Sequence, residues 1–294
     1  AQVYTCCHFA PWRAGSLEKS SLRDLWNSAP MLAARAMSLA GALPCHDRCT
    51  LLDEEERDAR PSPGDGIEIG YDRLRRLKLL FGELCNIDCV MCDQDHSSRR
   101  QLPLALIRER IDWSGIEEIE FQGGEPLAMN ESRKAYAWLT GEMGKKVNFL
   151  TNGLVMTREW AGRISRGSSW VYFSVNGARP ETHERVCRGA RWARVARSLG
   201  YLADARATDG SGIALVGHFT IVPQNIMEAP DFPGFAAGLG FARVEYGFEI
   251  STVPAWIRRH PGEVSGLRRR FASVLASPPL PVATYRLRRL GLVD

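Results

Sequence analysis

Hydrophobic positions between residues 67 and 250 follow two alternating patterns. Short apolar runs rich in β-branched and aromatic residues predict strands, and apolar residues recurring every three or four positions predict helices. The expected strands are 74–80, 117–121, 147–150, 170–175, 213–222 and 243–250. The expected helices between them are 104–111, 131–143, 157–165, 190–207 and 230–237.

Strands that alternate with helices form βαβ units and a parallel sheet. Six strands fall short of the eight that close a full barrel. We therefore expect an α/β fold, a partial (β/α)6 barrel over residues 67–252. Its ligands should bind at the carboxyl ends of the strands.

The two ends of the chain differ from this repeating region. Residues 1–52 are cysteine-rich, and we expect a helix over 22–39 with Ser20 or Ser21 as N-cap, Pro30 distorting its middle and Gly41 ending it. Residues 53–66 combine an acidic run with Pro and Gly and predict a linker. The tail, 253–294, is expected to carry one basic helix over 263–275, after Pro254.

Composition excludes several classes of protein. Hydrophobic residues make up 45% of the 294 residues, enough for a sizeable core. A net charge of +4 is too small to indicate a nucleic-acid partner. No apolar run reaches the roughly 20 residues that span a bilayer, and no secretory signal opens the sequence. We expect a cytoplasmic protein without a membrane or nucleic-acid partner.

The eight cysteines fall into groups. Seven lie in three clusters, and the eighth, Cys187, stands alone. Disulfide frameworks belong mostly to short secreted domains, so clustered thiols in a long chain indicate metal or cluster ligands instead. The three clusters are Cys6 and Cys7, then Cys45 and Cys49, then Cys85, Cys89 and Cys92.

The third cluster lies on the loop after the first expected strand. Three thiolates on a short loop can bind three irons of a cubic iron–sulfur cluster, which leaves the fourth iron open to another ligand. Two alternatives are a helix face, since the spacings of four and three match helical neighbours, and a zinc site. Polar residues within the loop weaken the helical alternative, and zinc would need a ligand from elsewhere.

Polar or glycine-rich motifs follow the next four expected strands. Because carboxyl ends of parallel strands meet at one edge of the sheet, these motifs should lie together. Two glycines would let the backbone approach a ligand, Glu125 would offer a carboxylate to an ammonium group, and Pro126 would fix the turn. In chain order the motifs are Gly123-Gly124-Glu125-Pro126, Thr151-Asn152-Gly153, Ser174-Val175-Asn176-Gly177 and the single residue Asn225.

Together, the CxxxCxxC loop and these motifs resemble the radical S-adenosylmethionine (radical SAM) enzymes. The resemblance covers roughly residues 67–250. It implies that the Gly-Gly-Glu-Pro motif contacts the methionine amino group, and that Met91 lies near the adenine, where the family usually has an aromatic residue. It also implies that Ser174 and Asn176 correspond to the family's S-[IVL]-D-G, with Asn176 replacing the usual Asp. Asn225 falls where the family often has a polar residue near SAM.

The resemblance also implies the chemistry. A [4Fe–4S] cluster on the loop would bind SAM and, once reduced by a donor such as flavodoxin or ferredoxin, would cleave SAM to methionine and a 5′-deoxyadenosyl radical. That radical would abstract a hydrogen atom from the substrate, while the protein orients and shields the reactants. A non-catalytic iron–sulfur or zinc protein is the alternative of another class, and it would lack the motifs after the strands.

Residues 1–52 resemble the SPASM or twitch segments that hold auxiliary iron–sulfur clusters, although such segments usually follow the barrel. Cys6, Cys7, Cys45 and Cys49 suit one auxiliary cluster, expected to be [4Fe–4S]. Adjacent side chains diverge in an extended chain, so one of the first pair is expected to point away. The fourth ligand is then that cysteine, a barrel residue or the substrate. A zinc site or a group of buried thiols is the alternative.

Two questions stay open. Cys187 is interpreted as a small buried residue, as a hydrogen-atom donor to a substrate radical, or as a further ligand of the auxiliary cluster. The expected substrate is a small biosynthetic intermediate, such as a sugar, aminoglycoside or nucleoside of an antibiotic pathway. The outcome would be carbon–sulfur bond formation, epimerisation or dehydrogenation. A peptide-modifying enzyme is the alternative, disfavoured because no segment matches a leader-binding domain of about 80 residues.

Overall fold

The computed structural model describes residues 1–5, 13–43 and 66–294. They form two compact units, one of Ala1–Leu77 with Leu102–Glu118 and one of Lys78–Gln101 with Ile119–Asp294. The expected division of the chain into segments ending at 52, 66 and 252 stays a prediction. No helix in these ranges is long and apolar enough to cross a membrane.

The first unit contains a small antiparallel pair, β1 (Gln2–Tyr4) and β2 (Arg13–Ser16), and the short helices α1 (Leu22–Trp26), α2 (Ala29–Leu39), η2 (Tyr71–Arg73) and α4 (Leu104–Arg110). The single helix expected over 22–39 is wrong, because two helices occupy this range. Ser21 begins α1 with a capping box to Asp24. Pro30 lies in the first turn of α2, where its missing N–H has no intrahelical partner to lose.

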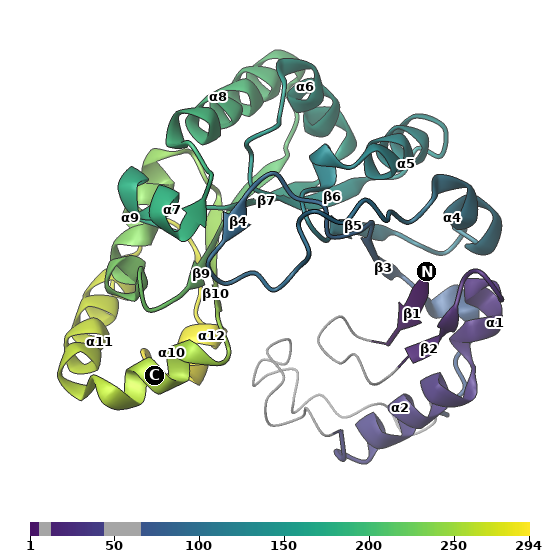
Figure 1. Cartoon of the computed structure of the whole chain (residues 1–294), viewed down its shortest axis with the longest axis horizontal. Helices are drawn as coiled ribbons and strands as arrows, with labels where there is room; N and C mark the ends of the chain where they lie inside the picture. Colours follow the sequence, from purple (N-terminus) through teal and green to yellow (C-terminus); the bar gives the residue numbers. More distant parts are fainter. Residues whose placement is uncertain (6–12, 44–65) are drawn as a thin grey trace. The chain divides into compact units, whose positions relative to one another are not determined.

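The main sheet has seven strands in the order β11-β10-β9-β7-β6-β5-β3 (Figure 1). Every neighbouring pair whose register is known is parallel. The six expected strands are confirmed, and the seventh, β11, is a two-residue strand too short for a sequence pattern to reveal. The bounds are β3 (Arg76–Leu80), β5 (Glu118–Gln122), β6 (Val147–Thr151), β7 (Trp170–Ser174), β9 (Ala214–Ile221), β10 (Arg243–Phe248) and β11 (Val282–Ala283).

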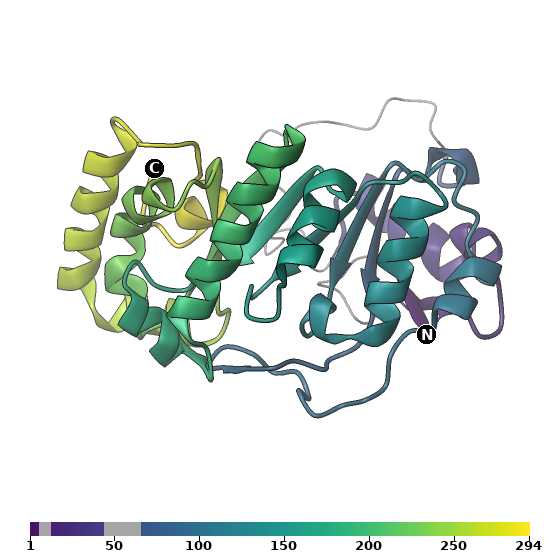
Figure 2. The same cartoon turned by 90° about the horizontal axis from the view of Figure 1, so that it is seen from above.

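Helices connect these strands, and Figures 1 and 2 show α5, α6 and α8 along one face of the sheet. The connecting helices are α5 (Asn130–Gly141), α6 (Arg158–Gly167), α7 (Pro180–Val186), α8 (Trp192–Asp209) and α9 (Phe232–Gly238), with short turns η3 (Pro126–Ala128) and η4 (Ile226–Asp231). A separate antiparallel pair joins β4 (Asp88–Cys89) to β8 (Cys187–Arg188).

The expectation of one helix in the tail is wrong. Three helices follow β10, namely α10 (Thr252–Arg259), α11 (Pro261–Leu275) and α12 (Tyr285–Arg289). Pro254 is the third residue of α10, and a proline is tolerated there because first-turn N–H groups have no intrahelical acceptor. The basic helix expected over 263–275 corresponds to α11.

Alternate side chains give the sheet two different faces. One face is apolar and packs on the helices: Phe149 stacks on Tyr136 of α5 with ring centroids 5.1 Å apart, and Phe219 packs on Phe232 of α9 at 4.9 Å. The opposite face, here called the polar face, carries charged, amide, aromatic and hydroxyl side chains that are only partly buried. Strand registers and cross-strand contacts place on it Lys78, Glu120, Gln122, Tyr172, Ser174, His218, Thr220 and Glu245.

Candidate active site

The three cysteines lie on the segment that follows β3, with Cys85 before β4, Cys89 in β4 and Cys92 after it. Cys85 and Cys89 are partly buried, whereas Cys92 is exposed. Burial raises the pKa of the Cys85 thiol to about 11 and also raises the pKa of Cys92. A hydrogen bond with Cys187, and then burial, raise the pKa of Cys89. Without a metal these thiols therefore stay protonated at neutral pH, and iron binding must release their protons.

The donor set fits an iron–sulfur cluster better than a single ion. Zinc would draw its thiolates to within about 2.3 Å of one point. In residues 1–5, 13–43 and 66–294, no three His, Cys, Asp or Glu side chains converge in that way. A cluster instead gives each thiolate a different iron, as a loop with spacings of four and three allows. Cys85, Cys89 and Cys92 thus suit a [4Fe–4S] cluster with one iron free of protein ligands.

The Gly-Gly-Glu-Pro turn packs against the chain segment that leads into Cys85. Gly124 N donates to Gly82 O at 2.9 Å, and Glu125 N donates to Leu84 O at 2.8 Å. A Cβ atom on Gly123 or Gly124 would collide with those backbone carbonyls. The sequence motif suggested glycines that approach a ligand. The structure shows that they let two backbone segments approach each other, and so fix the start of the cysteine loop.

Glu125 joins this turn to the next one. Its carboxylate is 1% exposed and accepts hydrogen bonds from Thr151 Oγ1 and Asn152 N, both at 2.8 Å, and from Leu127 N at 3.1 Å. Burial raises the pKa of Glu125 to about 7, against the opposing effect of these hydrogen bonds. Two carboxylate oxygens offer about four acceptor positions, so three donors leave one for a further group. Contact with the SAM ammonium stays a prediction.

Asn152 links the third strand's end to the cysteine loop. Its Nδ2 donates to Asn86 Oδ1 at 2.9 Å and lies 3.7 Å from Cys85 Sγ. Its Oδ1 accepts from Leu154 N at 3.0 Å, which fixes the orientation of the amide. Asn152 therefore positions a cysteine-bearing segment directly.

Asn176 and Asn225 are buried at 3% and 1% exposure and bond to each other's strand ends. Asn225 Nδ2 donates to Asn176 O at 3.1 Å and to Thr220 O at 2.9 Å, and its Oδ1 accepts from Val222 N at 2.8 Å. Asn176 Oδ1 accepts from Thr220 N at 2.8 Å. These side chains hold β7 and β9 together at their carboxyl ends, and contact with SAM stays a prediction for both.

The remaining residues expected in the site have varied positions. Ser174 lies on the polar face next to His218 in register, and Met91 is partly buried in the loop. Cys187 is 1% exposed and pairs with Cys89 across β4 and β8. Cys6, Cys7, Cys45 and Cys49 lie outside the described residues.

Sequence reasoning missed His96. Its Nε2 lies 3.1 Å from Cys92 Sγ, and its Nδ1 lies 3.4 Å from Asp88 Oδ1. The only available signal was its position four residues after Cys92 in a loop already singled out for its thiols.

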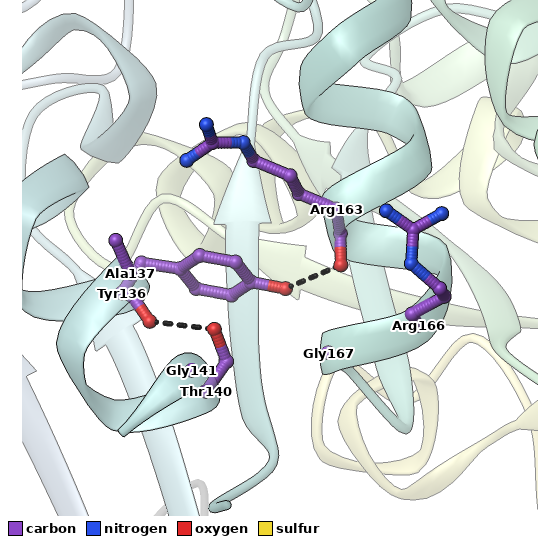
Figure 3. Close-up of a pocket in the computed structure, with 7 residues that line it drawn as sticks. All are labelled: Tyr136, Ala137, Thr140, Gly141, Arg163, Arg166 and Gly167. Atoms are coloured by element: carbon purple, nitrogen blue, oxygen red, sulfur yellow. Dashed lines mark hydrogen bonds between the residues drawn. The ribbon is translucent and has the colours of Figure 1, made fainter. Parts of the chain in front are cut away.

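A hollow of about 290 Å³ between α5 and α6 is separate from this site. It is lined by Tyr136, Thr140 and Arg163, among others, and Figure 3 shows Tyr136 pointing toward the Arg163 carbonyl. Tyr136 Oη donates to that carbonyl at 3.0 Å, and Thr140 Oγ1 donates to Tyr136 O at 2.8 Å. These side-chain hydroxyls are satisfied within the chain, and the hollow offers no reactive cluster.

Comparison with known proteins decides the family. The model of the radical SAM superfamily matches residues 79–232, from β3 to the start of α9. The chain belongs to the radical SAM superfamily. The cysteine loop, the Gly-Gly-Glu-Pro turn and the polar motifs after β6, β7 and β9 all lie within the matched range.

Individual relatives agree with this family. The chain is 29% identical over 197 residues to GTP 3′,8-cyclase of Corynebacterium glutamicum, a match covering 60% of this chain and 50% of that protein. It is 28% identical over 179 residues to PqqA peptide cyclase of Streptomyces rochei, covering 55% and 44%. The chain thus spans about half the length of the curated relatives it matches.

Solved structures share the fold. SuiB of Streptococcus suis bound to S-adenosylmethionine superimposes with a TM-score of 0.54 at 14% identity, covering 71% of this chain and 50% of that one. Native anSMEcpe with bound AdoMet gives a TM-score of 0.52 at 15% identity, covering 71% and 63%.

Proposed function

We propose that this radical SAM enzyme abstracts a hydrogen atom from a small substrate bound against the polar face of the sheet. When present, the [4Fe–4S] cluster on Cys85, Cys89 and Cys92 supplies the electron that cleaves SAM into methionine and a 5′-deoxyadenosyl radical. A reduced flavodoxin or ferredoxin is the proposed electron donor. The supporting observation is that the cysteine loop and three strand-end motifs are bonded into one constellation.

The chain's own residues orient the reactants. Glu125 keeps one acceptor position for the SAM ammonium, beside the amide of Asn152, which holds the loop. Ser174 lies on the polar face and so faces the same side as the expected substrate. Met91 would cover the adenine with a polarisable side chain.

The charged side chains on the polar face indicate which substrate charge the site favours. Its charged side chains mostly pair with each other: Lys78 with Glu120 at 3.3 Å, and Arg243 with Glu245 at 3.0 Å. These pairs cancel and select no ligand charge. Outside these ion pairs, the basic side chains at this face are Arg286 of α12 and His218 of β9.

Arg286 and His218 meet over Gly247. A Cβ atom on Gly247 would lie 3.3 Å from Arg286 Nη1 and 3.2 Å from His218 Cε1. Arg286 Nη1 donates to Tyr246 O at 3.1 Å, while its Nε is buried and lacks a partner among the described residues. No carboxylate of the described residues pairs with this guanidinium. A buried unpaired donor favours a negatively charged ligand, so the substrate is proposed to carry a carboxylate or phosphate.

This charge favours a small anionic metabolite such as a nucleotide or a sugar acid over an aminoglycoside. The similarity to GTP 3′,8-cyclase, whose name specifies a nucleotide, supports this class. The second candidate is a peptide substrate, supported by PqqA peptide cyclase and by the solved SuiB complex with precursor peptide SuiA. The final outcome, whether carbon–sulfur bond formation, epimerisation or dehydrogenation, belongs to the same proposal.

An auxiliary [4Fe–4S] cluster on Cys6 or Cys7, Cys45 and Cys49 is proposed from the sequence pattern alone. Reconstituted protein should then hold about eight irons per chain, four per cluster. Replacing both Cys45 and Cys49 by Ala should leave about four irons. If the double variant keeps the iron content of the wild type, these cysteines bind no cluster.

The substrate proposal is tested with Arg286→Gln and a matched control, Arg288→Gln, which changes an exposed arginine of the same helix. Substrate-dependent 5′-deoxyadenosine formation is measured with panels of anionic, neutral and cationic metabolites and with peptides. An anionic compound should stimulate the wild type, and Arg286→Gln should raise its KM by about tenfold or more, a loss typical of a charge-assisted hydrogen bond. Stimulation by peptides alone would favour the second candidate.

The same variants separate two sources of the anion, because SAM itself carries a carboxylate. SAM affinity is measured by equilibrium dialysis in the absence of substrate. A substrate subsite predicts an unchanged SAM affinity in Arg286→Gln. If Arg286 instead binds the carboxylate of SAM, the variant should bind SAM more weakly while its KM for the substrate stays unchanged.

A further inference from the structure

Cys187 is a buried thiol that hydrogen abstraction does not require. It pairs with Cys89 in the antiparallel register of β4 and β8, and Val90 N donates to Val186 O at 2.9 Å in the next pair. Hydrogen-bonded and non-hydrogen-bonded pairs alternate in an antiparallel ladder, so Cys89 and Cys187 form a non-hydrogen-bonded pair, whose side chains are the closer ones. Their side chains therefore lie beside each other on the same side of the β4–β8 pair.

Asn176 is the second partner of Cys187. Its Nδ2 lies 3.3 Å from Cys187 Sγ, while its Oδ1 accepts from Thr220 N at 2.8 Å. The backbone N–H of Thr220 can only donate, so it requires the oxygen of the amide on its side and places the NH2 group against Cys187. An NH2 group can only donate, and the sulfur of Cys187 therefore acts as acceptor toward Asn176. The S–H group of Cys187 can then donate its hydrogen bond toward Cys89.

We propose that Cys187 is a positioning residue whose S–H group donates a hydrogen bond to the thiolate of Cys89 when Cys89 binds iron, and that Asn176 fixes this direction. This inference rests on the proposed assignment of Cys89 to the SAM-binding cluster. Hydrogen bonds to ligating sulfurs stabilise the added electron and raise the reduction potential of an iron–sulfur cluster. Cys187 therefore makes the cluster easier to reduce.

The replacement of the family's usual Asp by Asn176 acquires a physical reason in this arrangement. An aspartate at this position would only accept hydrogen bonds, so the Cys187 proton would turn toward it and away from Cys89. The asparagine and the cysteine thus act as a pair. A thiol at 1% exposure whose sulfur accepts from Asn176 is a poor hydrogen-atom donor to a substrate, which distinguishes this role from the hydrogen-atom-donor interpretation of the sequence.

The experiment is a redox titration of the reconstituted protein, followed by electron paramagnetic resonance of the reduced SAM cluster. Cys187→Ala removes the donor and should decrease the equilibrium constant for one-electron reduction about tenfold, which is 59 mV. Cys187→Ser keeps a donor and should retain most of the wild-type potential. Asn176→Asp should lower the potential as well. Val186→Ala is the control, because it shortens a buried side chain next to Cys187 and removes no hydrogen-bond donor.

The outcomes distinguish the role of Cys187 from the proposed function. Equal potentials in the wild type and Cys187→Ala, with iron content and SAM cleavage retained, would overturn the inference and leave the proposed function intact. A shift in Val186→Ala as large as that in Cys187→Ala would also overturn it, since packing would then explain the effect. Failure of the wild type to assemble a SAM-cleaving cluster would instead overturn the proposed function.

Discussion

The cysteine loop and the buried motifs beside it are built in opposite ways. Cys85, Cys89 and Cys92 are partly buried or exposed, and the hydrogen-bond partners of Cys85 and Cys92 include side chains of the loop itself, namely Asn86, Gln94 and His96. Glu125, Asn176 and Asn225, in contrast, are at most 3% exposed, and their side chains bond to backbone groups of neighbouring strand ends. We call these three residues the platform. The difference indicates that the platform folds with the sheet, whereas the loop is completed by iron.

The two regions should therefore respond differently to substitution. Changes in the loop should remove iron with little effect on the stability of the iron-free protein. Changes in the platform should lower that stability, because buried donors or acceptors lose their partners.

The largest effect is expected from replacing Cys85, Cys89 and Cys92 together by Ala. The variant should lose the iron of the SAM cluster, about four atoms per chain, after anaerobic reconstitution. The melting temperature of the iron-free protein should change by no more than about 2 °C, because exposed or partly buried loop residues contribute little to packing. Iron assay and circular dichroism measure the two quantities. A large fall in melting temperature would show that the thiols stabilise the fold, and the loop would then not differ from the platform in this respect.

The next effect concerns pH and Glu125. Its folded pKa of about 7 lies above the ordinary value of 4.5, so the folded state binds a proton more tightly than the unfolded state. The stability from this group is fully present below about pH 4.5 and is lost as the pH rises through about 7, on the order of 3 kcal/mol in total. Urea unfolding of the iron-free protein across this range measures it.

The control for that measurement is Glu125→Gln, which cannot titrate. The difference in unfolding free energy between the two proteins should change with pH between 4.5 and 7. A pH-independent difference would mean that the carboxylate is solvated in solution, and the platform would then resemble the loop.

Asn225→Ala should lower the free energy of unfolding by about 1–3 kcal/mol, because Val222 N would lose its buried acceptor and Thr220 O its donor. The control Gln224→Ala changes an exposed neighbour and should have an effect within about 0.5 kcal/mol. Equal small effects in both variants would contradict a rigid platform.

The smallest effect is on SAM affinity. Glu125→Gln should weaken SAM binding about tenfold, or about 1.4 kcal/mol, because it removes a charge-assisted contact to the ammonium, and it should leave the iron content unchanged. Glu117→Gln, at an exposed position, is the control. Equilibrium dialysis with labelled SAM gives both affinities. An unaltered affinity would restrict Glu125 to a purely structural role.

The sequence predicted the parts of the fold that follow from periodicity. The six long strands and most helices between them were correct because apolar spacing reports which face is buried. Pro30 was misread because its effect depends on whether a helix starts beside it, and α10 was missed because Pro254 lies in a first turn. β11 has two residues and no pattern of its own.

The site was predictable in its positions and less so in its contacts. Motifs after strand ends located Glu125, Asn152 and Asn176, because parallel strands bring their carboxyl ends together. Their partners, such as Thr151 for Glu125 or Cys187 for Asn176, depend on distances between segments that no local pattern encodes.

The central claim is that the loop of Cys85, Cys89 and Cys92 makes this chain a SAM-cleaving enzyme. The most direct test is 5′-deoxyadenosine formation by the anaerobically reconstituted protein supplied with SAM and dithionite. The wild type is expected to form 5′-deoxyadenosine and methionine in equal amounts, and the triple Ala variant is expected to form neither. A reconstituted wild type that leaves SAM intact, or a triple variant as active as the wild type, would contradict the claim.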